Sequence, residues 1–155
     1  MAENFYTANA SLAGLDRLDV EGMRTIWRVE MAGEKFYELL AERIDNDEAR
    51  ELLRRNAVEE RGHARRIARA LSLALGTEWA PTAEEETLLD VPMPAEITAP
   101  LFSGIIQGEL NGDAGYQKWA DNEPNEEIAR LLRLNGREET IHADRARRVL
   151  EILSA

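Results

Sequence analysis

The chain has 155 residues, of which 44% are hydrophobic and 32% are charged, and its formal net charge is −11. This length accommodates one domain with a full core, and the acidic balance argues against nucleic acid and membrane surfaces as partners, because both attract basic patches. The sequence contains no cysteine, which excludes disulfides, thiolate nucleophiles, iron–sulfur clusters and four-cysteine iron sites.

The N-terminal segment does not show the pattern of a secretory signal. It lacks a basic stretch followed by an apolar run, and no apolar run in the chain approaches membrane-spanning length. We therefore expect a cytoplasmic protein. Residues 1–18 are mostly small and polar with little periodicity and predict an N-terminal arm, whereas residues 19–155 predict one helical domain.

Helical periodicity begins after the arm. The spacing of apolar residues predicts a first helix that starts at the N-cap Asp19 and reaches about Asp45. After a tight turn, a second helix is predicted from about Asp47 to Leu75, where Gly76 stops it. Because the loop is short, the two helices are expected to pack as an antiparallel hairpin.

A second hairpin follows a long connection. Residues 76–96 contain three prolines and leave room for a short helix over residues 82–89. A third helix is predicted from about Pro100 to Asp121, and a fourth begins at Pro124 or Asn125. The fold is therefore expected to be all-α, a four-helix bundle ordered up-down-down-up with one long crossover between helices two and three. We also expect the third helix to start at the end of the bundle where the first one starts.

The two histidines each lie three residues after a glutamate, as Glu60 with His63 and Glu139 with His142. Residues at this spacing share one face of a helix. Upstream of each pair lies another glutamate that is followed seven residues later by a tyrosine. These upstream residues are Glu30, Tyr37, Glu109 and Tyr116.

The two sets are related by one constant offset along the chain, and the residues around them repeat as well. Such self-similarity indicates an internally duplicated helical hairpin, over about residues 20–75 and 100–153. Four inward carboxylates and two imidazoles on four helices indicate a site for two metal ions inside the bundle.

This motif resembles the ligand set of the ferritin-like di-iron carboxylate proteins, including rubrerythrin and bacterioferritin, over about residues 20–153. The resemblance implies that Glu60 and Glu139 bridge the two metals, while Glu30 and Glu109 are terminal ligands. His63 and His142 would each bind one metal.

The expected cofactor is a pair of iron ions, with manganese as an option at one or both positions. Four carboxylates against two divalent cations give a nearly neutral cluster, whereas four buried carboxylates without metal would repel one another. Oxygen and imidazole ligands suit iron or manganese, and no thiolate favours zinc or copper.

The resemblance also suggests residues that support the ligands. Glu59 would hold His142 and Glu138 would hold His63, because a metal-bound histidine donates its other N–H to a carboxylate. The alternative is that both glutamates pair with surface arginines. Tyr37 and Tyr116 would donate to ligand carboxylates, or would pack in the core with their hydroxyls satisfied elsewhere.

Gly112 departs from the family pattern. Many rubrerythrins carry an extra glutamate there, which supports a metal shift linked to peroxide reduction, and Gly33 is the equivalent residue in the first hairpin. The two glycines indicate either space beside the metals or close helix packing, because glycine within a helix is otherwise unfavourable.

A second departure concerns Glu34 and Asp113, which follow the expected terminal ligands by four residues and are candidates for extra ligands or proton carriers. The segment from Arg28 to Glu34 also resembles the RVDHAGE segment of the di-iron hydroxylases of ubiquinone biosynthesis, in which the last glutamate is the ligand. On that alignment Glu34 replaces Glu30. We prefer Glu30, because its equivalent in the second hairpin is also a glutamate and both are followed by the tyrosine.

The expected activity is that of a non-haem di-iron oxidoreductase that reacts Fe(II) with peroxide or dioxygen, similar to a rubrerythrin peroxidase without a rubredoxin domain. Electrons would then come from a separate donor. The alternatives are a di-iron oxygenase acting on an organic substrate near Gly33 and Gly112, a ferroxidase or iron store, and a helical interaction module without metal. We expect a homodimer, since apolar surface for a partner is offered by the arm, Tyr6, Trp27, Trp79 and Trp119.

Overall fold

The structure is a computed structural model that describes residues 3–155, and within this range the protein is helical with no β-strand. The all-α prediction is therefore confirmed. The helices are α1 (Phe5–Ser11), α2 (Val20–Glu42), α3 (Asp47–Leu75), α4 (Ala83–Glu86), α5 (Ala99–Asp121) and α6 (Glu126–Ser154). None of these helices combines the length and the apolar character needed to cross a membrane.

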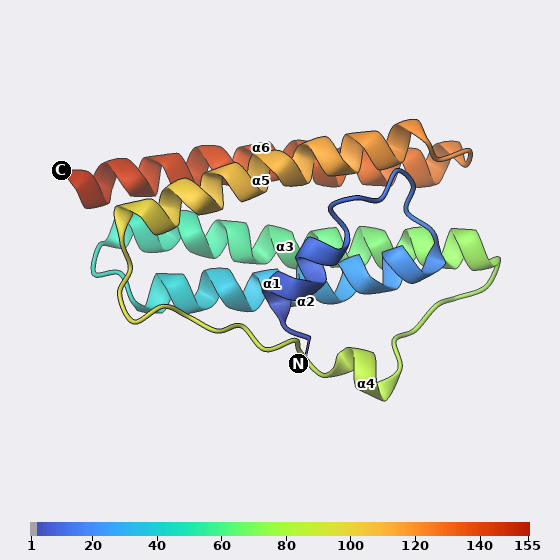
Figure 1. The fold of residues 1–155 in the computed structure, drawn as a ribbon, viewed down its shortest axis with the longest axis horizontal. Coiled ribbons are helices and arrows are strands. Elements are labelled where there is room, and N and C mark those ends of the chain that lie inside the picture. Colours follow the sequence, from blue (N-terminus) through green and yellow to red (C-terminus); the bar gives the residue numbers. More distant parts are fainter. Residues whose placement is uncertain (1–2) are drawn as a thin grey trace.

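Four long helices form the bundle as two antiparallel hairpins, α2 with α3 and α5 with α6, joined side by side through α3 and α6 (Figure 1). Their order along the chain is up-down-down-up. The expectation that the third long helix starts where the first one starts is wrong, because α5 starts at the end where α2 finishes. The connection that contains α4 carries the chain back along the whole bundle, which an up-down-down-up order requires (Figure 1).

Polar side chains set the helix boundaries. The Asp19 carboxylate accepts the N–H of Gly22 at 2.7 Å, as expected for an N-cap, and α3 ends at Gly76, whose φ of 70° is a left-handed conformation that glycine adopts readily. Helix α2 ends at Glu42, before the predicted Asp45. Asn46 must be extended to cap α3, so the preceding residues form the turn.

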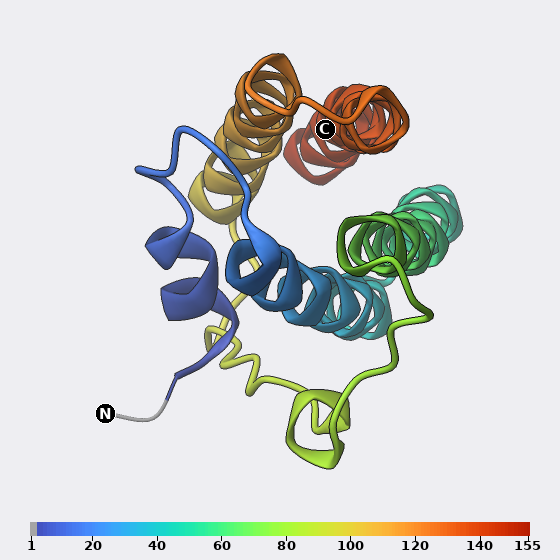
Figure 2. The ribbon, with the colours of Figure 1, turned by 90° about the vertical axis from the view of Figure 1, so that its right-hand side faces the viewer.

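The N-terminal arm contains a short helix that the weak periodicity did not reveal. Asn4 caps α1, and the Phe5 ring packs on Phe36 of α2 with 5.4 Å between ring centroids. The indole N–H of Trp119 donates to the Leu15 carbonyl oxygen at 2.8 Å. Figure 2, which looks along the bundle, shows α1 on the outside of α2, on the side of α5.

Two apolar clusters fill the ends of the bundle and leave a polar layer between them. Along α3, Leu53 lies in one cluster and Leu71 in the other, with the buried Glu60 and His63 between them. Burial of one such leucine contributes about 1.5–3 kcal/mol. The apolar ends therefore fix the helix register and place the polar residues at the middle of the bundle, away from water.

Most of the aromatic residues proposed as partner surface are engaged within the chain. Trp27 packs edge to face on Trp79 of the crossover, with 5.3 Å between ring centroids, and Trp119 is buried. Tyr6 is 42% exposed, although its hydroxyl donates to the Pro92 carbonyl oxygen at 2.6 Å. The homodimer stays a prediction.

Candidate metal centre

The structure brings together the six residues expected to bind metal, one from each of α2 and α5 and two from each of α3 and α6. The ligand atoms of Glu60, His63, Glu139 and His142 lie within 4.8 Å of one another. Both histidine rings are fully buried, and the Glu109 side chain is 11% exposed. The constant offset in the sequence therefore corresponds to a single cluster in the middle of the bundle.

The Nδ1 atoms of the two histidines mark two half-sites. His63 Nδ1 lies 3.0 Å from Glu139 Oε1, 3.3 Å from Glu60 Oε2 and 3.4 Å from Glu30 Oε2. His142 Nδ1 lies 3.4 Å from Glu60 Oε1 and 3.8 Å from Glu109 Oε2. The two oxygens of Glu60 thus face different histidines, as a bridging carboxylate must.

The donor atoms of this cluster fit metal ions. Although oxygens surround both histidine Nδ1 atoms, neither nitrogen makes an aligned hydrogen bond to any described residue, and the same holds for Glu109 Oε2. A buried polar atom without a partner is costly in a folded protein. Carboxylate oxygens around imidazole nitrogens are the ligands that iron and manganese take.

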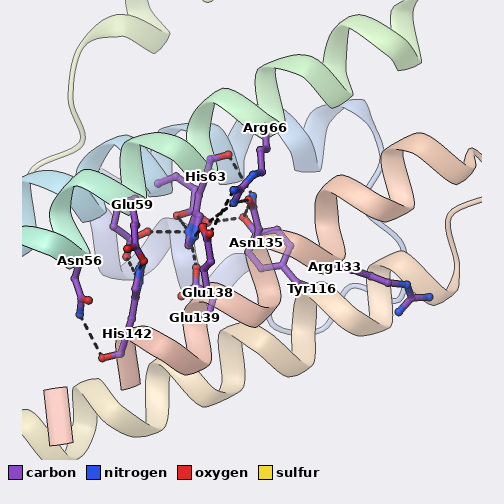
Figure 3. Close-up of polar contacts among 12 residues, drawn as sticks. Asn56, Glu59, His63, Arg66, Tyr116, Arg133, Asn135, Glu138, Glu139 and His142 are labelled. Atoms are coloured by element: carbon purple, nitrogen blue, oxygen red, sulfur yellow. Dashed lines mark hydrogen bonds and ion pairs between the residues drawn. The ribbon is translucent and has the colours of Figure 1, made fainter. Parts of the chain in front are cut away.

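The opposite nitrogen of each histidine contacts a glutamate from the other hairpin (Figure 3). His63 Nε2 lies 3.1 Å from Glu138 and His142 Nε2 lies 3.2 Å from Glu59. These hydrogen bonds and the neighbouring arginines lower the pKa of each glutamate to about 2. An ionised carboxylate only accepts, so the proton is assigned to Nε2 and Nδ1 is left free for a metal.

Each of these glutamates also pairs with an arginine, so the two alternatives drawn from the sequence occur together. Arg66 Nη1 donates to Glu138 at 2.7 Å, and Arg145 Nη1 donates to Glu59 at 2.9 Å. The histidine, the carboxylate and the arginine form one chain of contacts from the centre to the surface between α3 and α6.

Two buried asparagines complete this network, and sequence reasoning assigned them no role. Asn135 Nδ2 donates to the His63 carbonyl oxygen at 3.2 Å, and its Oδ1 accepts from Arg66 at 3.2 Å. Asn56 makes the equivalent contacts with His142 and Arg145, at 3.3 and 3.0 Å. The signal that could have revealed them is the repeat offset, which relates the asparagines and the arginines as it relates the ligands.

Each tyrosine hydroxyl donates to the terminal carboxylate of the opposite hairpin. Tyr37 donates to Glu109 and Tyr116 donates to Glu30. Burial and the nearby carboxylates raise both tyrosine pKa values well above their ordinary range. Both phenols therefore stay protonated and act as donors.

Glu34 and Asp113 lie apart from the six. Glu34 Oε1 accepts from Arg61 at 2.7 Å. Asp113 accepts from the Thr140 hydroxyl at 2.5 Å and from Gln117 at 3.0 Å. The structure thus places Glu30, and not Glu34, beside the histidines. A role for Glu34 or Asp113 as a proton carrier stays a prediction.

The glycines beside the ligands make room for the central carboxylates. A Cβ atom at Gly33 would lie 3.3 Å from the Glu60 carboxyl carbon, and one at Gly112 would lie 3.3 Å from Glu139 Oε2. Both glycines also line a cavity of about 900 Å³. Space beside the centre therefore explains them better than close packing of helices.

Without metal, the cluster holds protons. Burial and the charge of Glu60 raise the pKa of Glu30 to about 8. Burial opposes a charged His142, but the charge of the nearby Glu60 and the hydrogen bond to Glu59 raise the His142 pKa to about 9. At pH 7, below both values, these two groups are mostly protonated in the metal-free protein.

We expect metal binding at pH 7 to release more than one proton per chain, because ligation requires the carboxylate and the neutral imidazole. The apparent metal affinity then rises with pH until the pH exceeds the pKa values of these groups. Calorimetric titration with Mn(II) in two buffers of different ionisation enthalpy measures the released protons. Binding heats that are equal in both buffers would contradict the expectation.

The family model described as rubrerythrin matches residues 25–150. The chain belongs to the rubrerythrin family. The matched range includes all six residues of the cluster, in agreement with the resemblance to ferritin-like di-iron carboxylate proteins. No curated protein and no solved structure matched the chain. Membership of the rubrerythrin family and the buried cluster together indicate a metal-binding helical bundle.

Proposed function

We propose that this member of the rubrerythrin family is a di-iron oxidoreductase whose Fe(II) is oxidised by peroxide or dioxygen. The observation that carries the proposal is the pair of buried Nδ1 atoms without hydrogen-bond partners, which face four carboxylates at the middle of the bundle. Both oxidants accept electrons in pairs, and two adjacent irons supply one electron each when bound.

The residues of the chain hold the ligands in position. Glu138 and Glu59 orient the histidine rings through their Nε2 atoms. Tyr116 holds Glu30, and Tyr37 holds Glu109, each through a phenolic proton that lies at a carboxylate oxygen of the ligand. The apolar clusters keep water out from both ends of the bundle and so strengthen the electrostatic contacts within the layer.

In this proposal, a separate molecule supplies the electrons that return the centre to its reduced state. The sequence has no cysteine and therefore no ligands for a rubredoxin-type or iron–sulfur centre of its own. We propose a separate donor, either a redox protein or a small reductant.

The test is rapid mixing of the protein, loaded anaerobically with Fe(II), with hydrogen peroxide or with dissolved oxygen. We expect at least one oxidant to oxidise the bound iron faster than it oxidises free Fe(II) in the same buffer. The oxidation is monitored through the optical absorption of the iron. The Glu60→Gln variant is the control that lacks the bridging carboxylate. If neither oxidant reacts faster with the wild-type protein than with free Fe(II), the proposed function is wrong.

A further inference from the structure

The cavity beside the centre lies between α2 and α5 and extends beneath α1. Its volume of about 900 Å³ falls within the range of about 300–1,000 Å³ that is typical of small-molecule sites. Its walls are mainly apolar and include Ile26, Val29, Phe36, Leu101, Ile105 and Trp119.

The carboxylates of the centre form part of the lining of this cavity, while the histidines do not. Its lining includes Glu30, Glu60, Glu109 and Glu139. The histidine side is closed by the network of glutamates, arginines and asparagines between α3 and α6 (Figure 3). The centre therefore has one closed face and one open face, and a molecule in the cavity would contact the open face.

Glycines of α5 keep the cavity wide. Gly104, Gly108 and Gly112 follow one another at intervals of four residues and line it. A Cβ atom at Gly104 or Gly108 would meet no atom within 4 Å, so close packing does not require glycine at these two positions. Because glycine within a helix costs about 0.5–1 kcal/mol relative to alanine, this stretch of α5 gives up stability and gains empty volume.

The charges around the cavity restrict what it accepts. Lys118 is the basic residue among the lining residues, and its Nζ lies 2.8 Å from Asp16 Oδ1. No other described residue along the lining supplies a positive charge for an anion, and an ion moved into apolar surroundings loses its hydration. The remaining lining is mostly aliphatic or aromatic, with Phe5 and Tyr6 of α1 on the outer side.

We propose that this cavity binds an uncharged, mostly apolar organic molecule, of the class of a medium-chain alcohol or an alkylated aromatic, with one end against the carboxylates. Binding itself needs only the residues described. That the bound molecule meets a redox centre, as a substrate would, rests on the proposed function.

The proposal is tested by fluorescence titration of the purified, metal-containing protein with N-phenyl-1-naphthylamine, an uncharged apolar probe. We expect saturable enhancement of its emission. Competitors of equal chain length then test the effect of charge. We expect 1-decanol to displace the probe about tenfold or more better than decanoate does. Failure of the wild-type protein to bind the probe, or displacement by decanoate as good as by 1-decanol, would overturn the proposal.

Two glycine variants locate the binding. Gly108→Leu places a side chain in the cavity and is expected to weaken probe binding about tenfold, whereas Gly62→Leu, within α3 and outside the cavity, is expected to leave it unchanged. A Cβ at either position meets no atom within 4 Å, so the two substitutions are matched. Should Gly108→Leu alter iron content, Gly104→Leu replaces it. Equal binding by the cavity variant and the Gly62→Leu control would overturn the proposal.

Two further measurements distinguish a small molecule in the cavity from a second copy of the chain, and the cavity proposal from the proposed function. If size-exclusion mass analysis gives a dimer and the probe binds only when dilution separates the subunits, a second copy of the chain fills the cavity and the proposal fails. Iron oxidation is followed in parallel. If the wild-type protein oxidises iron faster than free Fe(II) is oxidised but does not bind the probe, this proposal alone is wrong. If it binds the probe without accelerated iron oxidation, the proposed function alone is wrong.

Discussion

Replacement of Glu30 by alanine is expected to lower the bound iron from two ions per chain to one or none, whereas Glu34→Ala is expected to keep both. Glu30 is 4% exposed, and its Oε2 lies 3.4 Å from His63 Nδ1. The Glu34 carboxylate instead pairs with Arg61, whose side chain is 52% exposed. A pair of this kind contributes about 0–1 kcal/mol, so its loss leaves the fold intact.

Iron is counted by elemental analysis after anaerobic loading and gel filtration. The Glu109→Ala and Asp113→Ala variants repeat the comparison in the second hairpin, where the same spacing separates the residues. Full iron occupancy in Glu30→Ala would show that Glu30 is not a ligand. Loss of iron in Glu34→Ala with full occupancy in Glu30→Ala would favour the alignment with the quinone hydroxylases.

Glu138→Leu is expected to weaken metal binding by about 10–100-fold, the range typical of residues that orient a ligand. Glu138 accepts from His63 Nε2 at 3.1 Å and from Arg66 at 2.7 Å. Without it, the proton on the imidazole is no longer held at Nε2, and the ring loses the contact that aims Nδ1 at the cluster. The half-buried Arg66 also loses the carboxylate that faces it.

The affinity is measured by competition with a chelator for Mn(II). Glu138→Gln, which retains an acceptor oxygen, should recover part of the loss, and a purely structural role would not predict this rescue. Glu127→Leu is the matched control, because Glu127 lies on the same helix and pairs with the exposed Arg130. Equal affinities for Glu138→Leu and Glu127→Leu would contradict a positioning role.

The two hairpins are equivalent around the ligands but differ next to them. Glu34 and Arg61 form an ion pair in the first hairpin, and the equivalent residues in the second are Asp113 and Thr140, which form a hydrogen bond. Among the residues that the structure describes, Asp113 therefore has no cationic partner. The surroundings of the two histidine half-sites therefore differ outside the six residues of the cluster.

The sequence by itself determined the four long helices and the six residues that form the central cluster. Local signals such as Asp19 as an N-cap and Gly76 as a stop predicted helix ends, because capping depends on neighbours within one turn. The constant offset between the two ExxH pairs indicated a common centre, since equivalent positions of a duplicated hairpin face the same axis of the bundle.

Only the tertiary structure decided which carboxylate each tyrosine holds, what the buried asparagines contact and where the centre opens. Tyr116 donates to Glu30, and Asn135 to the His63 backbone, across helices that are distant in sequence. Such pairs depend on the register between helices, which the packing of the apolar clusters at both ends sets. The cavity arises in the same way, because it depends on the separation of α2 from α5, which periodicity within either helix does not encode.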